Sequence, residues 1–466
     1  MTGMVAAGHP LTAEAGARIL REGGNAVDAA IAAMLVSWVA EPLLTGPGAG
    51  GYMLVAGAGE RETLLDFFVA APGFGAAGRR CELEAIEVSF GDATQVFNVG
   101  AASVGAYGNP AGIEEAARRW GTVPLADLAA PAAAYARAGV PLNAQQAYVF
   151  EILEGIVGER LLRVGDMFAD PELADAIERL GAEGAAPFYT GDIAAAVIAE
   201  LQPRGAVLTA EDLACYEAVA REPVRVSYRG RDVLTNPPPN AGGTLLAMAM
   251  ERLEQVDGVP DAAELADVME AVQAQRTPEF VSKLGSTTHI SVLDREGRAC
   301  SVTCTNGEGS GIWIPGTGIH VNNIMGEEDL NPLGFHAFPA GRRMPSMMAP
   351  TVVTNPAYPD GVELVVGSAG SNRIRSAILQ TIVGVVDRGL GARDAVEAPR
   401  LHFEDGIVFT EPGIDDDLLR RAGRVVKPFR AQNLFFGGVQ AVERDPATGA
   451  LTGAGDPRRG GVAVAA

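Results

Sequence analysis

The segment from Gly285 to Thr305 carries the side chains best placed to do chemistry, because two runs of β-forming residues flank a turn there. A three-residue loop at 295–297 places Gly297 in the left-handed position of a type I turn with a G1 bulge. Side chains alternate along a strand, so this register predicts three polar pairs: Ser291 with Ser301, His289 with Thr303, and Thr287 with Thr305.

The opposite face of this hairpin is apolar. The same register gives two apolar pairs: Ile290 with Val302 and Val292 with Cys300. A two-residue loop would instead pair Thr287 with Cys304 and would mix the two faces, so the three-residue register is preferred. On pattern alone, the hydroxyl-bearing face indicates a half-buried hairpin with a polar outer face.

The elements that must position the hairpin fall into two stretches of chain. Before about residue 286 helical patterns dominate, with one strand at 52–55 and helices at 11–21, 25–39, 113–120, 144–156, 171–180, 193–200 and 245–255. After it, one helix is expected at 376–387, with β-type runs at 288–293, 299–305, 318–323, 351–355, 363–366, 407–410 and 439–443. Helices followed by many strands predict an α+β or layered sandwich rather than alternating βαβ units.

A glycine-rich stretch at 46–51 matches the pattern G-x-G-x-x-G. A dinucleotide site needs a strand before that loop and a helix after it. Here a helix is expected before the glycines and a strand after them, so we interpret the stretch as a turn that brings backbones close together. The sequence also holds no Gly-x-Ser-x-Gly elbow and no P-loop lysine motif, which argues against a serine α/β-hydrolase and a P-loop nucleotide site.

Composition narrows the possible partners. The 466 residues carry a formal net charge of −22, and such a field repels nucleic acid and anionic membranes. No signal-peptide pattern opens the sequence, and the apolar run at 29–40 is shorter than the roughly 20 residues that a membrane span needs. The four cysteines are scattered and no histidines have metal-ligand spacing. We therefore expect a cytoplasmic protein without metal, organic cofactor, nucleic-acid partner or membrane partner.

The run from Thr287 to Asp294 resembles the start of the small subunit of γ-glutamyltranspeptidases, a family of N-terminal-nucleophile hydrolases. The likeness extends along nearly the whole chain, through separate motifs in the family's order: Gly23–Ala30, Glu41-Pro42 with the glycine-rich loop, Asn236–Gly243, Pro315–Gly318 with Asn322-Asn323, Met348–Thr351, Gly367–Gly370 and Asp456–Arg459. Any one motif is a weak signal, whereas the ordered set is specific. The resemblance implies an α+β fold, a four-layer αββα sandwich.

The resemblance also implies that the precursor cuts itself between Ser286 and Thr287. The two parts, 1–286 and 287–466, would remain together as a heterodimer forming one intertwined domain, which leaves further oligomerisation open. A threonine hydroxyl is a poor nucleophile until a base removes its proton. The α-amine that cleavage creates supplies this base and titrates near pH 8. No step of this mechanism needs an imidazole, so His289 is expected to be structural.

The family likeness assigns roles to further residues. Thr305 is expected to hydrogen-bond Thr287 and to hold its rotamer. The backbone N–H groups of Gly370 and Ser371 are expected to form the oxyanion hole. Ser346 aligns with a substrate-binding serine of the family.

The sequence departs from the family where glutamyl-specific members hold their donor. Phe68 stands in the place of an arginine that grips the donor's α-carboxylate, and a phenyl ring cannot replace a bidentate guanidinium. In the motif that binds the donor's α-amine, Asn323 keeps its place while Glu327 replaces the final aspartate. If glutamyl donors are accepted, another arginine, with Arg342 and Arg343 as candidates, would have to hold the carboxylate.

Two kinds of function stay open from the sequence. The first is an enzyme acting on a small-molecule amide or peptide. It would be either a γ-glutamyl transferase or hydrolase that holds its donor with other residues, or a cephalosporin-acylase-like enzyme. The second is an uncleaved scaffold or binding protein without catalysis. Intact Thr287, Thr305 and Gly370 favour the enzyme.

Overall fold

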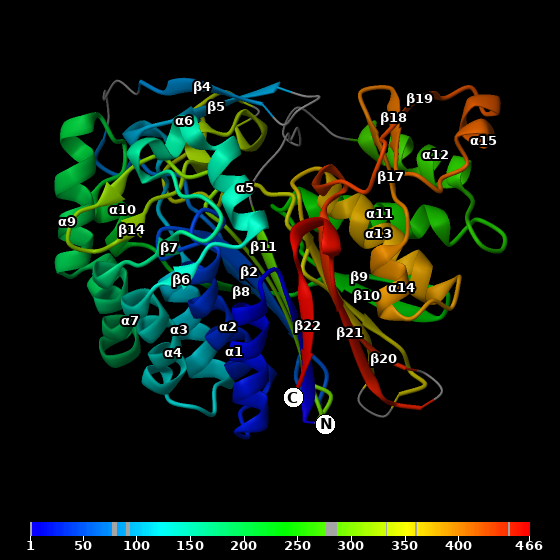
Figure 1. Cartoon of the computed structure of the whole chain (residues 1–466), viewed down its shortest axis with the longest axis horizontal. Coiled ribbons are helices and arrows are strands. Elements are labelled where there is room, and N and C mark those ends of the chain that lie inside the picture. The colour runs from blue at the N-terminus through cyan, green and yellow to red at the C-terminus, as the bar shows by residue number, and fades with distance from the viewer. Residues whose placement is uncertain are drawn as a thin grey trace.

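Two β-sheets pack face to face between two layers of helices (Figure 1). The computed structural model describes residues 2–76, 82–89, 94–275, 287–331, 333–358, 361–445 and 448–466. The seven-stranded sheet has the order β22 (Val462–Ala465), β1 (Gly3–Ala7), β11 (Thr288–Asp294), β12 (Ala299–Thr305), β2 (Gly50–Ala56), β3 (Thr63–Phe67) and β8 (Val219–Arg221). The six-stranded sheet has the order β21 (Leu451–Gly455), β20 (Gly438–Arg444), β16 (Val362–Ala369), β15 (Thr351–Thr354), β10 (Arg231–Thr235) and β9 (Val224–Tyr228).

Helices cover the outer face of each sheet (Figure 1). On the seven-stranded sheet they are α1 (Pro10–Arg21), α2 (Ala26–Ala40), α3 (Asn109–Trp120) and α4 (Leu125–Ala138), with α7 (Pro171–Glu183), α8 (Ala186–Tyr189), α9 (Asp192–Leu201) and α10 (Ala210–Ala214) further out. On the six-stranded sheet they are α11 (Ala241–Leu253), α12 (Ala262–Gln273), α13 (Arg373–Val386) and α14 (Ala392–Glu397). The predicted four-layer αββα sandwich is confirmed.

Smaller elements extend the loops of the sandwich. They are the hairpin β4 (Glu84–Ser89) and β5 (Thr94–Val99), α5 (Ala144–Ile152), α6 (Glu154–Val157), the pair β6 (Val140–Pro141) and β7 (Met167–Phe168), the pair β13 (Trp313–Ile314) and β14 (Ile319–His320), and a small sheet of β17 (Leu401–Glu404), β18 (Ile407–Thr410) and β19 (Val425–Pro428) beside α15 (Asp416–Arg421). Figure 1 shows the β4–β5 hairpin and the small sheet at the same end of the molecule.

Helix α2 is the most deeply buried helix against the seven-stranded sheet, as its Ala-rich sequence predicts, because every one of its residues is buried. Its start is fixed by a capping box, in which the side chain of Asn25 accepts from the backbone N–H of Asp28 and the side chain of Asp28 accepts from the backbone N–H of Asn25. The small alanines let α2 approach β11 and β12 closely. The helix ends at Ala40, and the next residue, Glu41, contacts Thr288 at the start of β11.

The hairpin β11–β12 has the predicted three-residue register. Its pairs include His289 with Thr303 and Ser291 with Ser301. Gly297 has φ +83° and its N–H donates to the carbonyl of Asp294 (3.1 Å). The face predicted to be apolar packs on the helical layer.

The polar face of the hairpin does not face solvent, so the expectation of a polar outer face is wrong. Every residue of β11 and β12 is buried, and the hydroxyl ladder points at the second sheet. Ser291 donates to the carbonyl of Gln440 in β20 (3.0 Å), and Ser301 donates to the carbonyl of Val366 in β16 (3.3 Å). The pattern misled because a sheet covered on both sides can bury polar side chains when the facing sheet supplies partners.

Several element boundaries differ from the sequence expectation. The first half of the chain contributes six strands to the two sheets, β1, β2, β3, β8, β9 and β10, of which only β2 was expected. The helix expected at 144–156 is broken at Leu153 into α5 and α6, and the strand expected at 318–323 shrinks to Ile319–His320. Helix α2 precedes the glycine-rich stretch and β2 follows it, as predicted. Gly51 allows the predicted close approach, because a Cβ there would collide with the carbonyl of Thr303.

The N-terminal strand β1 lies between two strands from the far end of the chain. It pairs with β11 on one side and with β22 on the other. The N–H of Thr2 donates to the carbonyl of Ala466 (2.7 Å), so the two ends of the sequence meet, as Figure 1 shows. Residues before and after 286 therefore share one sheet, and the sandwich would hold two fragments together after a cut at that point.

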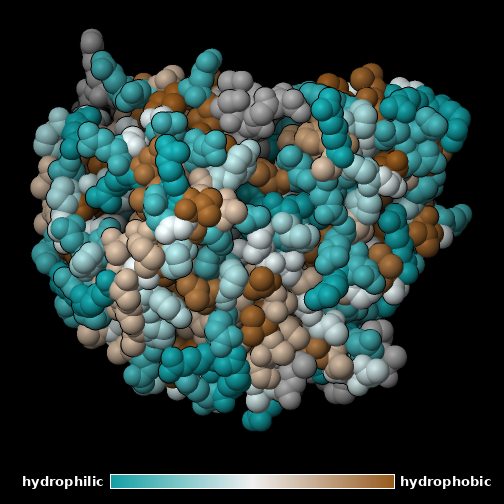
Figure 2. All heavy atoms as spheres, in the orientation of Figure 1, coloured by the Kyte–Doolittle hydropathy of each residue, from teal (hydrophilic) through white to brown (hydrophobic). Residues whose placement is uncertain are grey.

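The surface view shows mainly hydrophilic residues, with hydrophobic ones scattered in small groups (Figure 2). Among the described residues, no helix combines the length and the apolar character needed to span a bilayer.

The packing of the two sheets predicts that Gly367→Ala destabilises the fold. A Cβ at Gly367 would overlap the imidazole ring of His289, which hydrogen bonds hold on both sides. Overpacking of this kind costs about 1–3 kcal/mol. Urea unfolding should show a lower midpoint with an unchanged slope. Gly46→Ala is the matched control, since nothing lies within 4 Å of a Cβ there, and equal midpoints for the two variants would contradict the packing argument.

Candidate active site

Thr287 and Thr305 occupy neighbouring positions at one end of the hairpin. Thr288 pairs with Cys304, so the register carries Thr287 to the position opposite Thr305. Both threonines are buried. The Oγ1 of Thr305 accepts a hydrogen bond from the N–H of Gly307 (3.0 Å), which ties the hydroxyl to the loop that follows β12. Ser286, on the other side of the expected cut, lies outside the described residues.

His289 sits in the centre of a buried hydrogen-bond network. Its Nδ1 is 2.7 Å from the Oγ1 of Thr303, and its Nε2 is 3.0 Å from the Oγ of Ser291. Burial lowers the pKa of His289 to about 3, so the ring is neutral at physiological pH. The network joins the two sheets, and its position fits the structural role expected for His289.

A strained turn ends β16 at the same end of the sandwich. Ser301 contacts Val366, and the histidine ring covers the next residue of β16, Gly367. Strands β12 and β16 therefore run in the same direction here. Thr305 lies four residues beyond Ser301, and Gly370 lies four residues beyond Val366, so both reach the same end of the sandwich. Gly370 has φ +113°, a conformation that favours glycine.

The residue after this glycine is strained as well. Ser371 has φ +52°, which costs a non-glycine residue of the order of 1–3 kcal/mol, and strained residues of this kind cluster at functional sites. Helix α13 begins two residues later, so the positive end of its dipole lies at the turn. The turn has the geometry and the electrostatic setting of an anion-stabilising site.

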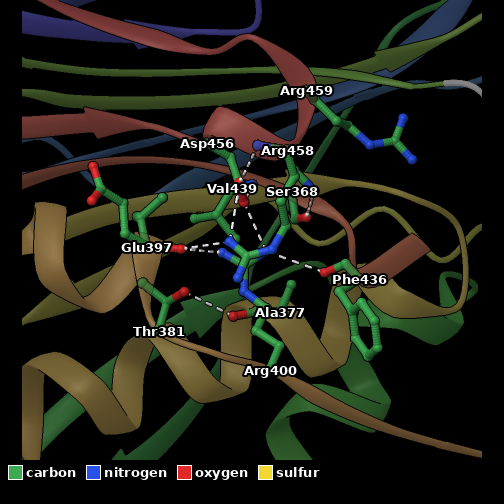
Figure 3. A network of polar contacts seen from close by, with 12 residues as sticks. Ser368, Ala377, Thr381, Glu397, Arg400, Phe436, Val439, Asp456, Arg458 and Arg459 are labelled. Atoms are coloured by element: carbon green, nitrogen blue, oxygen red, sulfur yellow. Dashed lines mark hydrogen bonds and ion pairs between the residues drawn. The ribbon is translucent and has the colours of Figure 1, made fainter. Parts of the chain in front are cut away.

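Figure 3 shows a buried ionic network built on Arg400, Asp456 and Arg458. Arg400 pairs with Asp456 (2.7 Å) and donates to the carbonyl of Phe436 (3.1 Å). Arg458 pairs with Asp456 (3.1 Å) and with Glu411 (2.5 Å). The network thus fixes the short 3₁₀ helix Leu434–Phe436, whose following residue packs against the turn at 370.

Arg459 points away from that network, as Figure 3 shows. A Cβ on Gly370 would lie 3.4 Å from its Nη2, so the guanidinium is next to the strained turn. Its Nη2 donates to the carbonyl of Leu434 (3.3 Å). Burial, reinforced by repulsion from Arg373, lowers the pKa of Arg459 to about 10, which still leaves a full positive charge at neutral pH.

Asn323 and Glu327 come together over the loop after Thr305. A Cβ on Gly307 would collide with the Oδ1 of Asn323 and the Oε1 of Glu327, and its φ of +65° also requires glycine. The Oδ1 of Asn323 accepts from the N–H of Glu308 (2.9 Å). The predicted donor-amine residues, of which Glu327 is half-buried, therefore lie beside Thr305, together with a buried carboxylate, Glu308.

Phe68 is fully buried between the sheets, where its ring stacks on Tyr52 with centroids 5.5 Å apart. Its backbone packs against Gly50, which pairs with Thr305, so the residue lies near the hairpin end. The ring is part of the core between the sheets and does not form an exposed wall.

The positions of Arg342 and Arg343 do not favour either of them as a partner for a donor carboxylate. Arg343 donates to the carbonyls of Phe68 and Glu217 and pairs with Asp66 (3.3 Å). Those partners use most of its donors. Arg342 is exposed and lies over the ring of Phe338 (4.6 Å).

Ser346 lies in the segment that runs beside Val69, as shown by the bond from the N–H of Met344 to the carbonyl of Val69 (3.0 Å). Its Oγ accepts from the N–H of Met348 (3.0 Å), and its carbonyl accepts from the first two N–H groups of α11. Ser346 is therefore held in a loop that is hydrogen-bonded to the start of α11 and to the chain at Val69.

Sequence reasoning missed two residues near the site. Glu41 was noted only as part of a Glu-Pro motif, yet its carboxylate accepts from Thr288 (2.7 Å), the residue next to Thr287. Arg459 was noted only in the closing motif. Glu41 could have been noticed because it is an ionisable residue inside an apolar stretch. No local signal existed for Arg459, because its neighbour Gly370 is remote in sequence.

Comparison with known proteins agrees with this geometry. The family model for gamma-glutamyltranspeptidase matches residues 12–280 and 259–466. The chain is 31% identical to the glutathione hydrolase proenzyme of Escherichia coli (strain K12), over 98% of this chain and 90% of that protein. It is 30% identical to the acylase ACY 1 proenzyme of Pseudomonas sp. (strain SE83), over 99% of this chain and 93% of that protein. A solved cephalosporin acylase from Bacillus halodurans superposes with a TM-score of 0.82 at 26% identity, covering 100% of this chain and 96% of that one.

The fold is that of the N-terminal-nucleophile hydrolases, with a threonine at the start of an inner strand. Within that class, the chain belongs to the γ-glutamyltranspeptidase family.

The pairing of Thr287 with Thr305 predicts that Thr305→Val slows the reaction. The change removes a hydroxyl and keeps the shape, and loss of a bond that positions a nucleophile should lower kcat by roughly ten- to a thousand-fold. Turnover of an acyl 4-nitroanilide measures the effect. Thr303→Val, on the same face two residues away, should instead lower stability by about 1–3 kcal/mol with little change in kcat. Unchanged maturation and unchanged kcat in Thr305→Val would show that the assigned role is wrong.

Proposed function

We propose that this chain is a self-processing threonine amidase that cuts itself before Thr287 and then cleaves a small amide through an acyl-enzyme on that residue. The observation that carries the proposal is the placement of Thr287 immediately before the inner strand β11, where the register brings it opposite Thr305 and to the same end as the strained turn at Gly370. The names of the relatives, hydrolase and acylase proenzymes, support the same chemistry.

Self-cleavage would begin with attack of the Thr287 hydroxyl on the carbonyl carbon of Ser286. A C–O bond forms, the C–N bond breaks, and the hydroxyl proton passes to the nitrogen, which becomes the α-amine of Thr287. Water then hydrolyses the resulting ester and leaves a carboxylate on Ser286. The products are 1–286 and 287–466, and the pairing of β1 with both β11 and β22 keeps them in one intertwined domain.

Substrate turnover would use the same hydroxyl. The free α-amine takes its proton as the oxygen attacks the amide carbonyl, and the N–H groups of Gly370 and Ser371 stabilise the oxyanion. The proton passes to the leaving amine, and the acyl group stays on Thr287 as an ester. Water or an acceptor amine then releases the acyl group, so one site supports both hydrolysis and transfer.

The donor is proposed to be an amide whose acyl chain lacks an α-carboxylate. Phe68 fills the place of the family's arginine, and Arg343 is engaged by Asp66 and by backbone carbonyls. A carboxylate brought into that region would lose its hydration without gaining a cation, at a cost of several kcal/mol. Glu327 and Glu308 remain beside Thr305 to attract an amine. The acylase reading is thus favoured over a γ-glutamyl specificity.

A substitution of Phe68 by arginine would not simply restore a binding site for the donor's α-carboxylate. The ring is fully buried and stacked on Tyr52, so Phe68→Arg places a cation in the core between the sheets. Donor specificity is better measured with substrates than with this variant.

We predict that the purified protein consists of two fragments, and that sequencing of the smaller one begins Thr-Thr-His. Thr287→Ala removes the attacking hydroxyl, so it should run as one full-length band and show no turnover. A denaturing gel with N-terminal sequencing measures both results. Wild-type protein that stays intact and still turns over an amide would rule out the mechanism, whereas intact and inactive protein would favour the non-catalytic scaffold.

Four 4-nitroanilides that share one carbon chain separate the roles of the donor's two charged groups. The γ-glutamyl compound carries an amine and a carboxylate, the 4-aminobutyryl compound only the amine, the glutaryl compound only the carboxylate, and the butyryl compound neither. We expect kcat/KM for the 4-aminobutyryl compound to exceed that for the γ-glutamyl compound by about tenfold or more, since each 1.4 kcal/mol is a factor of ten. A γ-glutamyl preference of that size would show that another cation holds the carboxylate.

A further inference from the structure

Glu41 is a buried carboxylate that contacts the hairpin next to the nucleophile. Its two oxygens accept from two hydroxyls, the Oγ1 of Thr12 in α1 (3.0 Å) and the Oγ1 of Thr288 in β11 (2.7 Å). The residue is 1% exposed. Gly8 packs directly against the carboxylate, because a Cβ at this position would lie 2.7 Å from the Oε2 of Glu41.

Burial of this carboxylate is costly and is not balanced by a positive charge. Burial raises the pKa of Glu41 to about 7, although the two hydroxyl bonds oppose the shift, and no charged side chain in the described part of the chain contributes to it. The titratable residue beside Gly8 is His9, which caps α1; burial lowers its pKa to about 4, so it is neutral here. Leucine or methionine would fill the same space without that cost.

The contacts of Glu41 indicate what the carboxylate provides. Thr288 is the first residue of β11, and one peptide bond joins it to Thr287. Side chains alternate along the strand, so Thr288 points at the helical layer while Thr287 points at the second sheet. By holding the Thr288 hydroxyl, Glu41 fixes the backbone next to Thr287. It does so from the helical side of the sheet, whereas Thr305 lies on the side that faces the second sheet.

We propose that Glu41 is a positioning residue for the reaction of Thr287, acting through its hydrogen bond with Thr288. This rests on the proposed function and assigns a residue that sets the nucleophile's geometry before and after self-cleavage. An ionised carboxylate only accepts, so it fixes the direction of both hydroxyl bonds, and bonds to a charged acceptor are stronger than neutral ones. Above pH 7, where this carboxyl is ionised, its negative charge lies beside Thr288, one residue from the point where cleavage creates an α-amine.

Substitutions at the two hydroxyls give a matched comparison. Thr288→Val removes the bond that leads to the nucleophile, and Thr12→Val removes the equivalent bond that leads to α1. We expect Thr288→Val to slow self-cleavage and to lower kcat by about tenfold or more, with KM changed less than about threefold. Thr12→Val should have a clearly smaller effect on both rates. Thr288→Ser keeps the hydroxyl and should restore both rates.

The charge itself is tested by Glu41→Gln, which can keep both hydroxyls bonded with one bond reversed. Because the folded-state pKa of Glu41 is raised, its contribution to stability is greatest below its ordinary value near 4.5 and is lost as the pH rises through about 7. Glu41→Gln should therefore unfold at a higher urea concentration than wild type at pH 8.5, while self-cleavage and kcat fall. A residue that merely holds the fold would lose stability and activity together.

Glu443→Gln is the control for removing a buried carboxyl. Burial also raises the pKa of Glu443, but it lies near the far end of β20, opposite Leu364, and caps the N–H of Ala392. This variant should keep wild-type rates of self-cleavage and turnover. A loss of rate equal to that of Glu41→Gln would mean that any such change disturbs the site, and would overturn the proposal.

The outcomes separate this proposal from the proposed function. Wild type that cleaves itself, with Thr288→Val cleaving and turning over at the same rates, would refute the role of Glu41 alone. Equal losses in Thr288→Val and Thr12→Val would also refute it, because the carboxylate would then act only on the fold. Wild type that neither cleaves nor turns over any of the four anilides would refute both.

Discussion

The close contact between the two sheets is the constraint on which the rest of the structure depends. Gly367 of β16 lies against the ring of His289 in β11, and no larger residue fits there. The contact is polar, because the hydroxyls of Ser291 and Ser301 bond to carbonyls of the facing sheet. Polar groups buried in this way must find partners at fixed positions, so they define one register between the sheets where an apolar layer would allow sliding.

A fixed register between the sheets brings the end of the hairpin and the end of β16 to the same place. The strained residues Gly370 and Ser371 are then set by the network of Arg400 and Asp456 behind them, and Thr287 is set by its neighbours in the seven-stranded sheet. Buried neighbours therefore hold both the end of the hairpin and the turn at Gly370. This arrangement matches the requirement that catalytic geometry be fixed before the substrate arrives.

Local patterns in the sequence predicted a layered α+β fold and the hairpin register, because alternating side chains and turn glycines leave short-range signals. The four-layer αββα arrangement followed instead from the resemblance of the motifs to a known family. The sequence did not predict β1, whose short run of small residues has no strong β signal, although the strand joins both ends of the chain. It singled out Phe68 as a departure from the family but could not show that the ring is enclosed in the core between the sheets. The roles of Glu41 and Arg459 depend on contacts with residues far away in the sequence, which no local pattern records.

The central claim is that the hydroxyl of Thr287 carries the acyl group during turnover. Mass spectrometry of protein quenched in acid during steady-state hydrolysis of the best of the four anilides tests it most directly. The account predicts a fragment of residues 287–466 that is heavier by the mass of the acyl group, with the added mass on its N-terminal residue. An acyl group on any other residue, or an intact chain that turns over substrate without an adduct, would contradict the account.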